Sequence, residues 1–178
     1  MRKIKKRISD EKRKLFEKLT VIVIDEISMV RADLLDCIDA FLRLHGPKKG
    51  KPFGGVQMVF IGDLYQLPPV VMSQERHAFS QLYKSPYFFS ARSFGELEMD
   101  FIELEKVYRQ KDDSFIKLLN AIRNKTAEPR DYEKINERHD ANFEPPKGEL
   151  YISLTSTNAD TDKINEKEMG KLSGKEAV

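Results

Sequence analysis

The most continuous hydrophobic stretch of the chain lies at residues 21–24, which read Val-Ile-Val-Ile and run directly into Asp25 and Glu26. β-branched side chains favour an extended backbone. An apolar run without alternation is typical of a strand that is covered on both faces, as in a parallel sheet flanked by helices. The pattern therefore predicts a central strand that ends in two carboxylates.

Two further stretches extend this unit. Residues 33–44 place leucine, isoleucine and phenylalanine at helical spacing, and residues 56–61 form a second apolar run that is followed by Asp63. The helix and loop between the two strands have the length of a right-handed crossover. We therefore expect Asp63 at the same edge of the sheet as Asp25 and Glu26.

The second strand leads into a loop that is stiffened by proline. Pro68 and Pro69 exclude a helix at this point, which places Gln66 on a rigid loop beside the carboxylates.

Residues 72–95 are rich in aromatic side chains. A place in the core is favoured for these side chains over stacking on single-stranded bases. The remaining expected elements are helices after Ser9, at 114–125 and from Pro129, short strands at 101–104 and 150–154, a linker at 142–148 and a polar helix that opens at 155–158.

Composition sets broad limits on the class of protein. The chain has 178 residues, of which 40% are hydrophobic, and a net charge of only +2, so bulk charge gives no sign of a nucleic-acid partner. Its single cysteine, Cys37, excludes an intrachain disulfide and a cysteine-based zinc site. The sequence contains no apolar run long enough for a membrane span, and no apolar stretch follows the basic N-terminus as in a signal peptide. We expect an intracellular protein with one domain, or one domain and part of a second.

The acidic pair admits more than one chemistry. On a strand end Asp25 and Glu26 would take opposite sides, so that one holds Mg²⁺ through water while the other faces an attacking water. Three alternatives stay open: an acidic turn that caps the next helix, a metal-dependent phosphoesterase or nuclease that also uses Asp63, and a non-catalytic nucleic-acid-binding or protein-binding module.

A combination of motifs is more specific than the acidic pair. Residues 24–29 read Ile-Asp-Glu-Ile-Ser-Met, residues 54–55 are Gly-Gly, and residues 62–70 read Gly-Asp-Leu-Tyr-Gln-Leu-Pro-Pro-Val. Together they resemble the petite-integration-frequency family of DNA helicases, in the RecD-like branch of superfamily 1. Residues 108–110 and 155–158 resemble later blocks of that family. The resemblance implies an α/β fold: part of a RecA-like P-loop NTPase domain with three layers and a mostly parallel central sheet.

The resemblance also implies roles for individual residues. Asp25 would bind Mg²⁺ through water, and Glu26 would position the hydrolytic water. Gln66 would sense the γ-phosphate, and Arg109 would stabilise charge on the transferring phosphoryl group. Nucleic-acid contacts are expected at five further positions: Pro68, Pro69, Val70, Thr155 and Asn158. ATP and Mg²⁺ are the implied cofactors, single-stranded or forked DNA the implied partner, and DNA repair, recombination and genome maintenance the implied setting.

One departure from the family is plain. A motor of this class needs the phosphate-binding pattern G-x-x-x-x-G-K-[ST], and the nearest match, residues 46–51, is one residue too short and runs into Pro52. We therefore expect a piece of a larger helicase, with residues 1–147 from the first motor domain and 148–178 from the start of the second. Such a piece alone should bind neither ATP nor Mg²⁺ tightly and turn over no ATP. It should also self-associate through exposed sheet edges.

Overall fold

The computed structural model describes residues 8–146, 149 and 151–171. Its contacts divide the chain into two units, Met1–Asp112 and Asp113–Val178, and each is described by itself. The domain boundary expected between residues 147 and 148 lies outside the described residues and stays a prediction.

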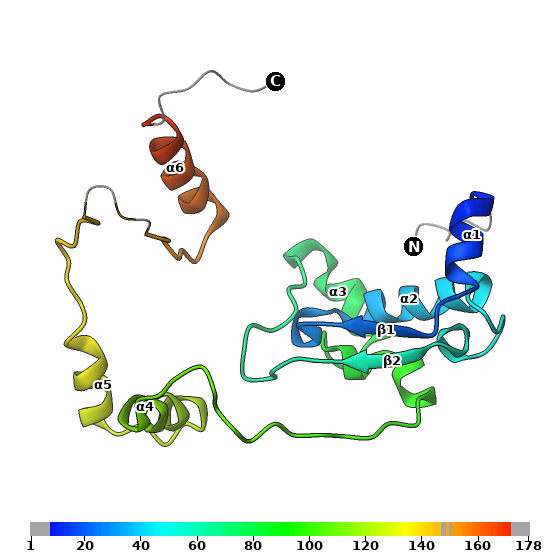
Figure 1. Ribbon diagram of the computed structural model, residues 1–178, viewed down its shortest axis with the longest axis horizontal. Coiled ribbons are helices and arrows are strands. Elements are labelled where there is room, and N and C mark those ends of the chain that lie inside the picture. The colour runs from blue at the N-terminus through cyan, green and yellow to red at the C-terminus, as the bar shows by residue number, and fades with distance from the viewer. Residues whose placement is uncertain (1–7, 147–148, 150, 172–178) are drawn as a thin grey trace. The chain divides into compact units, whose positions relative to one another are not determined.

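The first unit is built on a parallel pair of strands. β1 (Val21–Ile24) and β2 (Gln57–Phe60) pair in register, with β1 residue Ile22 opposite Met58. Helix α2 (Ala32–His45) lies between them in sequence and runs along one face of the pair (Figure 1). The α/β class and the parallel sheet predicted from the sequence are confirmed.

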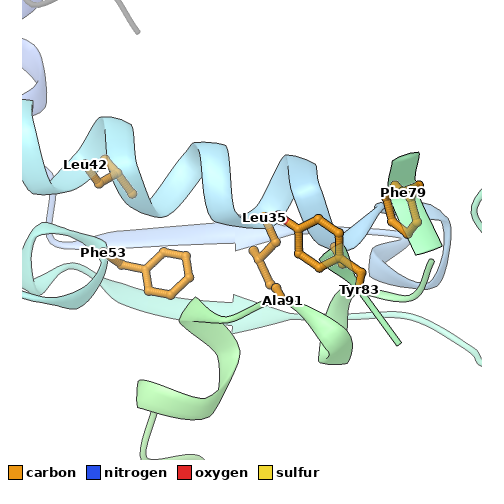
Figure 2. Close-up of a cluster of buried hydrophobic side chains, with 7 residues drawn as sticks. Leu35, Leu42, Phe53, Phe79, Tyr83 and Ala91 are labelled. Atoms are coloured by element: carbon orange, nitrogen blue, oxygen red, sulfur yellow. The ribbon is translucent and has the colours of Figure 1, made fainter. Parts of the chain in front are cut away.

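Helix α2 and the aromatic segment after it cover one face of the strands (Figure 2). The buried core cluster consists of Ala32, Leu35, Leu42, Phe53, Phe79, Tyr83 and Ala91. Ile22 and Ile24 pack against it, and burial of each such side chain contributes roughly 1.5–3 kcal/mol. Val21 and Val23 alternate to the other face and are 43% and 57% exposed. The expectation that both faces of β1 are covered is therefore wrong within the described residues.

The aromatic segment at residues 72–95 supplies part of the core, as predicted. It contains α3 (Ser73–Leu82) and two 3₁₀ turns, Phe88–Ser90 and Ser93–Glu96. Tyr83 is 7% exposed, and its hydroxyl donates a 2.9 Å hydrogen bond to Asp36 Oδ2 on α2. Burial and this carboxylate raise the pKa of Tyr83 to about 12. The remaining helical elements of this unit are α1 (Asp10–Phe16) and the 3₁₀ turns Ile27–Met29 and Pro52–Gly55.

Two predicted strands are absent from the described residues. Residues 101–104 and 151–154 are assigned to no strand or helix, and the side chains of Phe101 and Leu154 are 89% and 94% exposed. A strand needs a neighbour that completes its hydrogen-bond ladder. Neither segment has such a neighbour among the residues that the structure describes, so the strand predictions are wrong here.

The described part of the second unit contains three helices: α4 (Asp113–Arg123), α5 (Pro129–Asn136) and α6 (Asn158–Met169). All three were expected from the sequence. Proline occupies the first helical position of α5, and the side chains of Glu128 and Asp131 form a capping box at its start. Thr157 caps α6 by accepting a hydrogen bond from the backbone of Asp160. Across the described residues, no helix combines the length and the hydrophobicity that a membrane crossing requires.

Candidate active site

The two strands bring their carboxyl ends to the same edge, as the sequence predicted. Beyond the strands, Ile61 N–H donates to Ile24 O and Ile27 N–H donates to Ile61 O, both at 2.9 Å. Gly62 makes this close approach possible, because a Cβ there would lie 2.9 Å from Ile27 Cγ2. The segments that carry Asp25, Glu26 and Asp63 therefore meet at one end of the sheet.

Glu26 adopts an unusual backbone conformation. Its φ of 51° and ψ of 42° lie in the left-handed region, which costs a non-glycine residue roughly 1–2 kcal/mol. Its N–H donates a 2.9 Å hydrogen bond to Asp25 Oδ1, and both carboxylates are exposed. The expectation that the two residues alternate sides as strand residues does not hold, because β1 ends at Ile24 and a turn follows.

Asp63 organises the loop that carries Gln66. Its Oδ1 accepts from Tyr65 N–H at 3.0 Å, and its Oδ2 accepts from Gln66 Nε2 at 3.4 Å. Its backbone carbonyl accepts from Gln66 N–H at 3.0 Å. Aspartate at the start of a turn commonly makes such bonds. Pro68 and Pro69 are the only source of order that the sequence predicts for this loop, and the hydrogen bonds of Asp63 add a second one.

The site contains an open hollow of about 490 Å³. It is lined by Glu26, Met29, Tyr65, Gln66 and Leu67. The structure thus brings Glu26 and Gln66, which are far apart in sequence, to one hollow, with Asp25 adjacent to Glu26. The three other lining side chains were not identified from the sequence, since exposed apolar residues in turns carry no periodic signal. A concave apolar surface with a few polar groups is typical of a ligand site.

Ser28 lies in the turn after Glu26 and is completely buried. Its Oγ has no hydrogen-bond partner among the described residues. An unpaired buried hydroxyl costs roughly 1–3 kcal/mol. The same turn therefore contains two unfavourable features, the left-handed backbone of Glu26 and the unpaired hydroxyl of Ser28.

Other predicted site residues lie outside this cluster. Arg109 is exposed at a bend in a segment without assigned helix or strand, and it is not among the residues that line the hollow. Thr155 and Asn158 belong to the second unit, where Thr155 Oγ1 lies 2.6 Å from Thr161 Oγ1 and Asn158 begins α6. The roles expected for these three residues stay predictions.

The acidic pair fits a hydrated magnesium ion better than a metal cluster. Among the described residues, Asp25 Oδ1 accepts one hydrogen bond and Oδ2 accepts none, so Oδ2 is available to a water ligand. Mg²⁺ commonly keeps several waters and binds through one or two carboxylates together with substrate phosphates. The described residues contain no group of three or more histidine, cysteine, aspartate or glutamate side chains placed to hold a metal. The three-acid phosphoesterase alternative therefore lacks its ligand set.

A parallel α/β unit with an acidic pair at its carboxyl edge is typical of RecA-like NTPase domains, the fold of the solved structures that this chain resembles. Residues 1–132 match the PIF1-like helicase family, and the chain belongs to that family.

Individual relatives agree with this assignment. The chain is 36% identical to the ATP-dependent DNA helicase PIF1 of Emericella nidulans over 98% of its own length and 22% of the relative's. It is 37% identical to a Pif1 helicase from Bacteroides, solved in complex with ADP-AlF₃ and single-stranded DNA, with a TM-score of 0.86. That match covers 97% of this chain and 40% of the solved one. For the Pif1 helicase of Candida albicans, the values are 27% identity and a TM-score of 0.73, over 92% of this chain and 35% of the other. The chain thus spans about a fifth of the curated relative and two fifths of the bacterial structure.

Proposed function

We propose that this chain forms part of the ATP-hydrolysing centre of a DNA helicase that couples hydrolysis to translocation on single-stranded DNA and unwinding of the duplex. The observation that carries the proposal is the hollow at the carboxyl edge of β1 and β2, where Glu26 and Gln66 meet beside Asp25. The family membership supports it, as do relatives whose names describe ATP-dependent DNA helicases. DNA repair, recombination and genome maintenance are the proposed setting, at an intracellular location.

The two residues of the acidic pair, Asp25 and Glu26, have different proposed roles. Asp25 would hold a hydrated Mg²⁺ through a water ligand at Oδ2, and the ion would supply positive charge for the phosphates of the nucleotide. Glu26 orients the attacking water and receives its proton. The hydrogen bond from Glu26 N–H to Asp25 Oδ1 links the two residues, so the carboxylate of Asp25 also fixes the backbone of Glu26.

Gln66 and Arg109 act on the phosphoryl group. The amide of Gln66 can donate to a γ-phosphate oxygen and accept from the attacking water. Its 3.4 Å contact with Asp63 Oδ2 restrains the amide near the hollow before ATP binds. The planar guanidinium of Arg109 suits the charge on the transferring group. Because Arg109 lies on an exposed segment, this role requires that segment to close over the nucleotide.

The DNA path is proposed to follow the loop after Gln66. Val70 is 75% exposed and Pro68 is exposed, whereas Pro69 is buried and anchors the loop. Thr155 and Asn158 are proposed to contact DNA from the second unit. One solved relative, 38% identical over 95% of this chain and 40% of its own length, with a TM-score of 0.83, is described as two coordinating Pif1 helicases that unwind forked duplex DNA. Single-stranded or forked DNA is therefore the proposed partner.

The test is Glu26→Gln in the complete gene product that contains this chain. We expect ATP turnover in the presence of DNA to fall by about 10²–10⁴-fold, the usual contribution of a positioned general base. Nucleotide binding should persist, because the variant keeps the size of the side chain. Glu98→Gln, an exposed glutamate outside the hollow, is the matched control and should leave turnover unchanged.

Two results would count against the proposal. Turnover that survives Glu26→Gln would remove Glu26 from the chemistry. Mg²⁺-dependent cleavage of DNA without ATP would favour the phosphoesterase alternative instead.

A further inference from the structure

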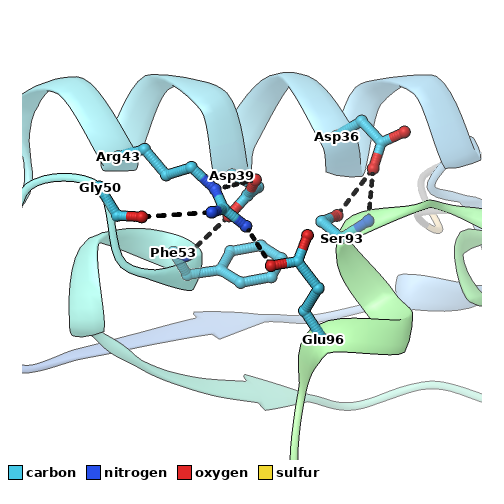
Figure 3. Close-up of polar contacts among 7 residues, drawn as sticks. All are labelled: Asp36, Asp39, Arg43, Gly50, Phe53, Ser93 and Glu96. Atoms are coloured by element: carbon cyan, nitrogen blue, oxygen red, sulfur yellow. Dashed lines mark hydrogen bonds and ion pairs between the residues drawn. The ribbon is translucent and has the colours of Figure 1, made fainter.

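The loop between α2 and β2 is held in place by a buried carboxylate. Asp39, on α2, is 7% exposed. Its Oδ1 accepts from the backbone N–H of Phe53 at 2.7 Å, and its Oδ2 accepts from Arg43 Nε at 2.7 Å (Figure 3). The ring of Phe53 is completely buried in the core cluster. The C-terminal half of the loop is thus fixed by both its backbone and its side chain.

Arg43 fixes the other half of the same loop. Its Nη1 donates to Gly50 O at 3.2 Å, and the N–H of Gly50 donates back to Arg43 O at 2.9 Å. Arg43 Nη2 also pairs with Glu96 at 2.8 Å. These contacts give residues 46–55 a defined conformation that includes left-handed backbone at Gly50 and Phe53.

The lysine loop, defined here as Lys48, Lys49 and Lys51, is the outward face of this segment. All three side chains are exposed, and residues 46–55 contain no acidic residue. Lys48 lies over Gly55, where an added Cβ would come within 2.7 Å of its Cδ. Lys49 pairs at 3.9 Å with Glu17, the residue that follows α1. The result is an array of cations on a rigid frame.

This array is separate from the candidate active site. The lysine loop leads into the start of β2, whereas Asp63 and Gln66 follow its end. Four residues of strand span roughly 13 Å at about 3.3 Å per residue. A ligand on the lysine loop therefore occupies the opposite end of the sheet from the hollow.

We propose that the lysine loop binds the phosphodiester backbone of a nucleic acid. Lysine serves as a point charge for phosphate and needs no specific base. A loop that is already ordered loses little conformational freedom on binding. A protein partner is disfavoured because protein interfaces depend on exposed aromatic anchors, and the one aromatic residue of this loop, Phe53, is buried. The phosphodiester can come from a duplex or from a single strand.

The experiment replaces all three lysines with glutamine in the complete gene product and measures DNA binding by fluorescence anisotropy over a range of salt concentrations. For a duplex, the slope of log K against log salt should become less steep by about 2.7, at about 0.9 per lost contact. For a single strand the expected change is about 2.1, at about 0.7 per contact. If the duplex shows its expected slope change and the single strand shows less than its own, the loop binds duplex DNA. The reverse result means that the loop binds a single strand.

Matched variants separate charge from other effects. Lys117, Lys125 and Lys134, three exposed lysines of the second unit, form the control triple, and their change to glutamine should reduce the slope by less than the lysine-loop triple does. Replacing the loop lysines with arginine should keep the wild-type slope. If the glutamine triple fails to fold, Lys51→Gln alone should still reduce the slope by about 0.7–0.9.

Unchanged slopes for both DNAs in a folded triple variant would overturn the proposal. An equal reduction in the control triple would overturn it too, because the effect would then reflect net charge. Glu26→Gln tests the active site independently, so loss of turnover there with an unchanged lysine-loop slope would support the proposed function and reject this one.

Discussion

The two ends of the β1–β2 sheet are built differently. At the amino end, Phe53 is completely buried and the carboxylate of Asp39 is satisfied by a backbone N–H and a guanidinium. At the carboxyl end, Glu26 has a left-handed backbone, Ser28 has an unpaired buried hydroxyl among the described residues, and Leu67 is 69% exposed. Each end contains one left-handed non-glycine residue, Phe53 at the amino end and Glu26 at the carboxyl end, so the two ends differ in burial and in hydrogen bonding.

The difference lies in how the buried groups at each end are satisfied. The hydrogen bonds of Asp39 and the ring of Phe53 lie at the end away from the proposed chemistry, whereas Phe79 and Tyr83 extend the aromatic core toward the carboxyl end (Figure 2). The carboxyl end exposes polar and apolar side chains, Glu26, Gln66 and Leu67 among them, as the proposed nucleotide site requires. Proteins commonly accept local strain at functional sites and compensate for it elsewhere.

The largest expected effect compares one large apolar side chain at each end. Phe53→Ala should lower the free energy of unfolding by about 3–5 kcal/mol, because it leaves a cavity in the core. Leu67→Ala should change it by less than about 0.5 kcal/mol, because that side chain is largely exposed. Urea denaturation of both variants measures the difference, and similar losses would contradict the contrast between the two ends.

A smaller effect is expected from two buried serines. Ser28→Ala removes the unpaired hydroxyl and should raise the free energy of unfolding by about 1 kcal/mol. Ser93→Ala is the matched control: its Oγ donates a 2.8 Å hydrogen bond to Asp36, so the change should lower that free energy by about 1 kcal/mol. Urea denaturation of Ser28→Ala and Ser93→Ala compares their free energies of unfolding. A loss of stability in Ser28→Ala would show that its hydroxyl has a partner.

The smallest effect concerns the backbone of Glu26. Asparagine tolerates the left-handed region better than glutamate, so Glu26→Asn should raise the free energy of unfolding by roughly 0.5 kcal/mol while it removes ATP turnover. Thermal unfolding and an ATPase assay on the complete gene product measure the two effects. Glu98→Asn, at an exposed position with no left-handed backbone, should change neither. A less stable Glu26→Asn variant would mean that the conformation of Glu26 is not strained.

Several elements were predictable because their signals are local. Four consecutive β-branched residues define β1, and helical spacing of apolar residues defines α2. The crossover then brings Asp63 to the edge that carries Asp25 and Glu26, because it makes β1 and β2 parallel and parallel strands end at the same edge of a sheet. The motifs around Asp25 and Gln66 also identified the helicase family, which the family match confirms.

Other features depend on contacts between distant segments. The exposure of Val23 and the absence of a strand at residues 101–104 follow from which neighbours cover a face or complete a ladder, and an apolar run cannot show this. The hydrogen bond from Phe53 to Asp39 joins residues 14 positions apart, with no periodic signal.

The sequence by itself therefore determined β1, β2, the helix that connects them, the family and the end of the sheet that carries the acidic pair. The tertiary structure alone decided the left-handed turn at Glu26, the apolar wall of the hollow and the rigid frame of the lysine loop. Local propensity and periodicity act over a few residues, so they can be recognised in the sequence. Burial and hydrogen-bond partners are set by segments that meet only after folding.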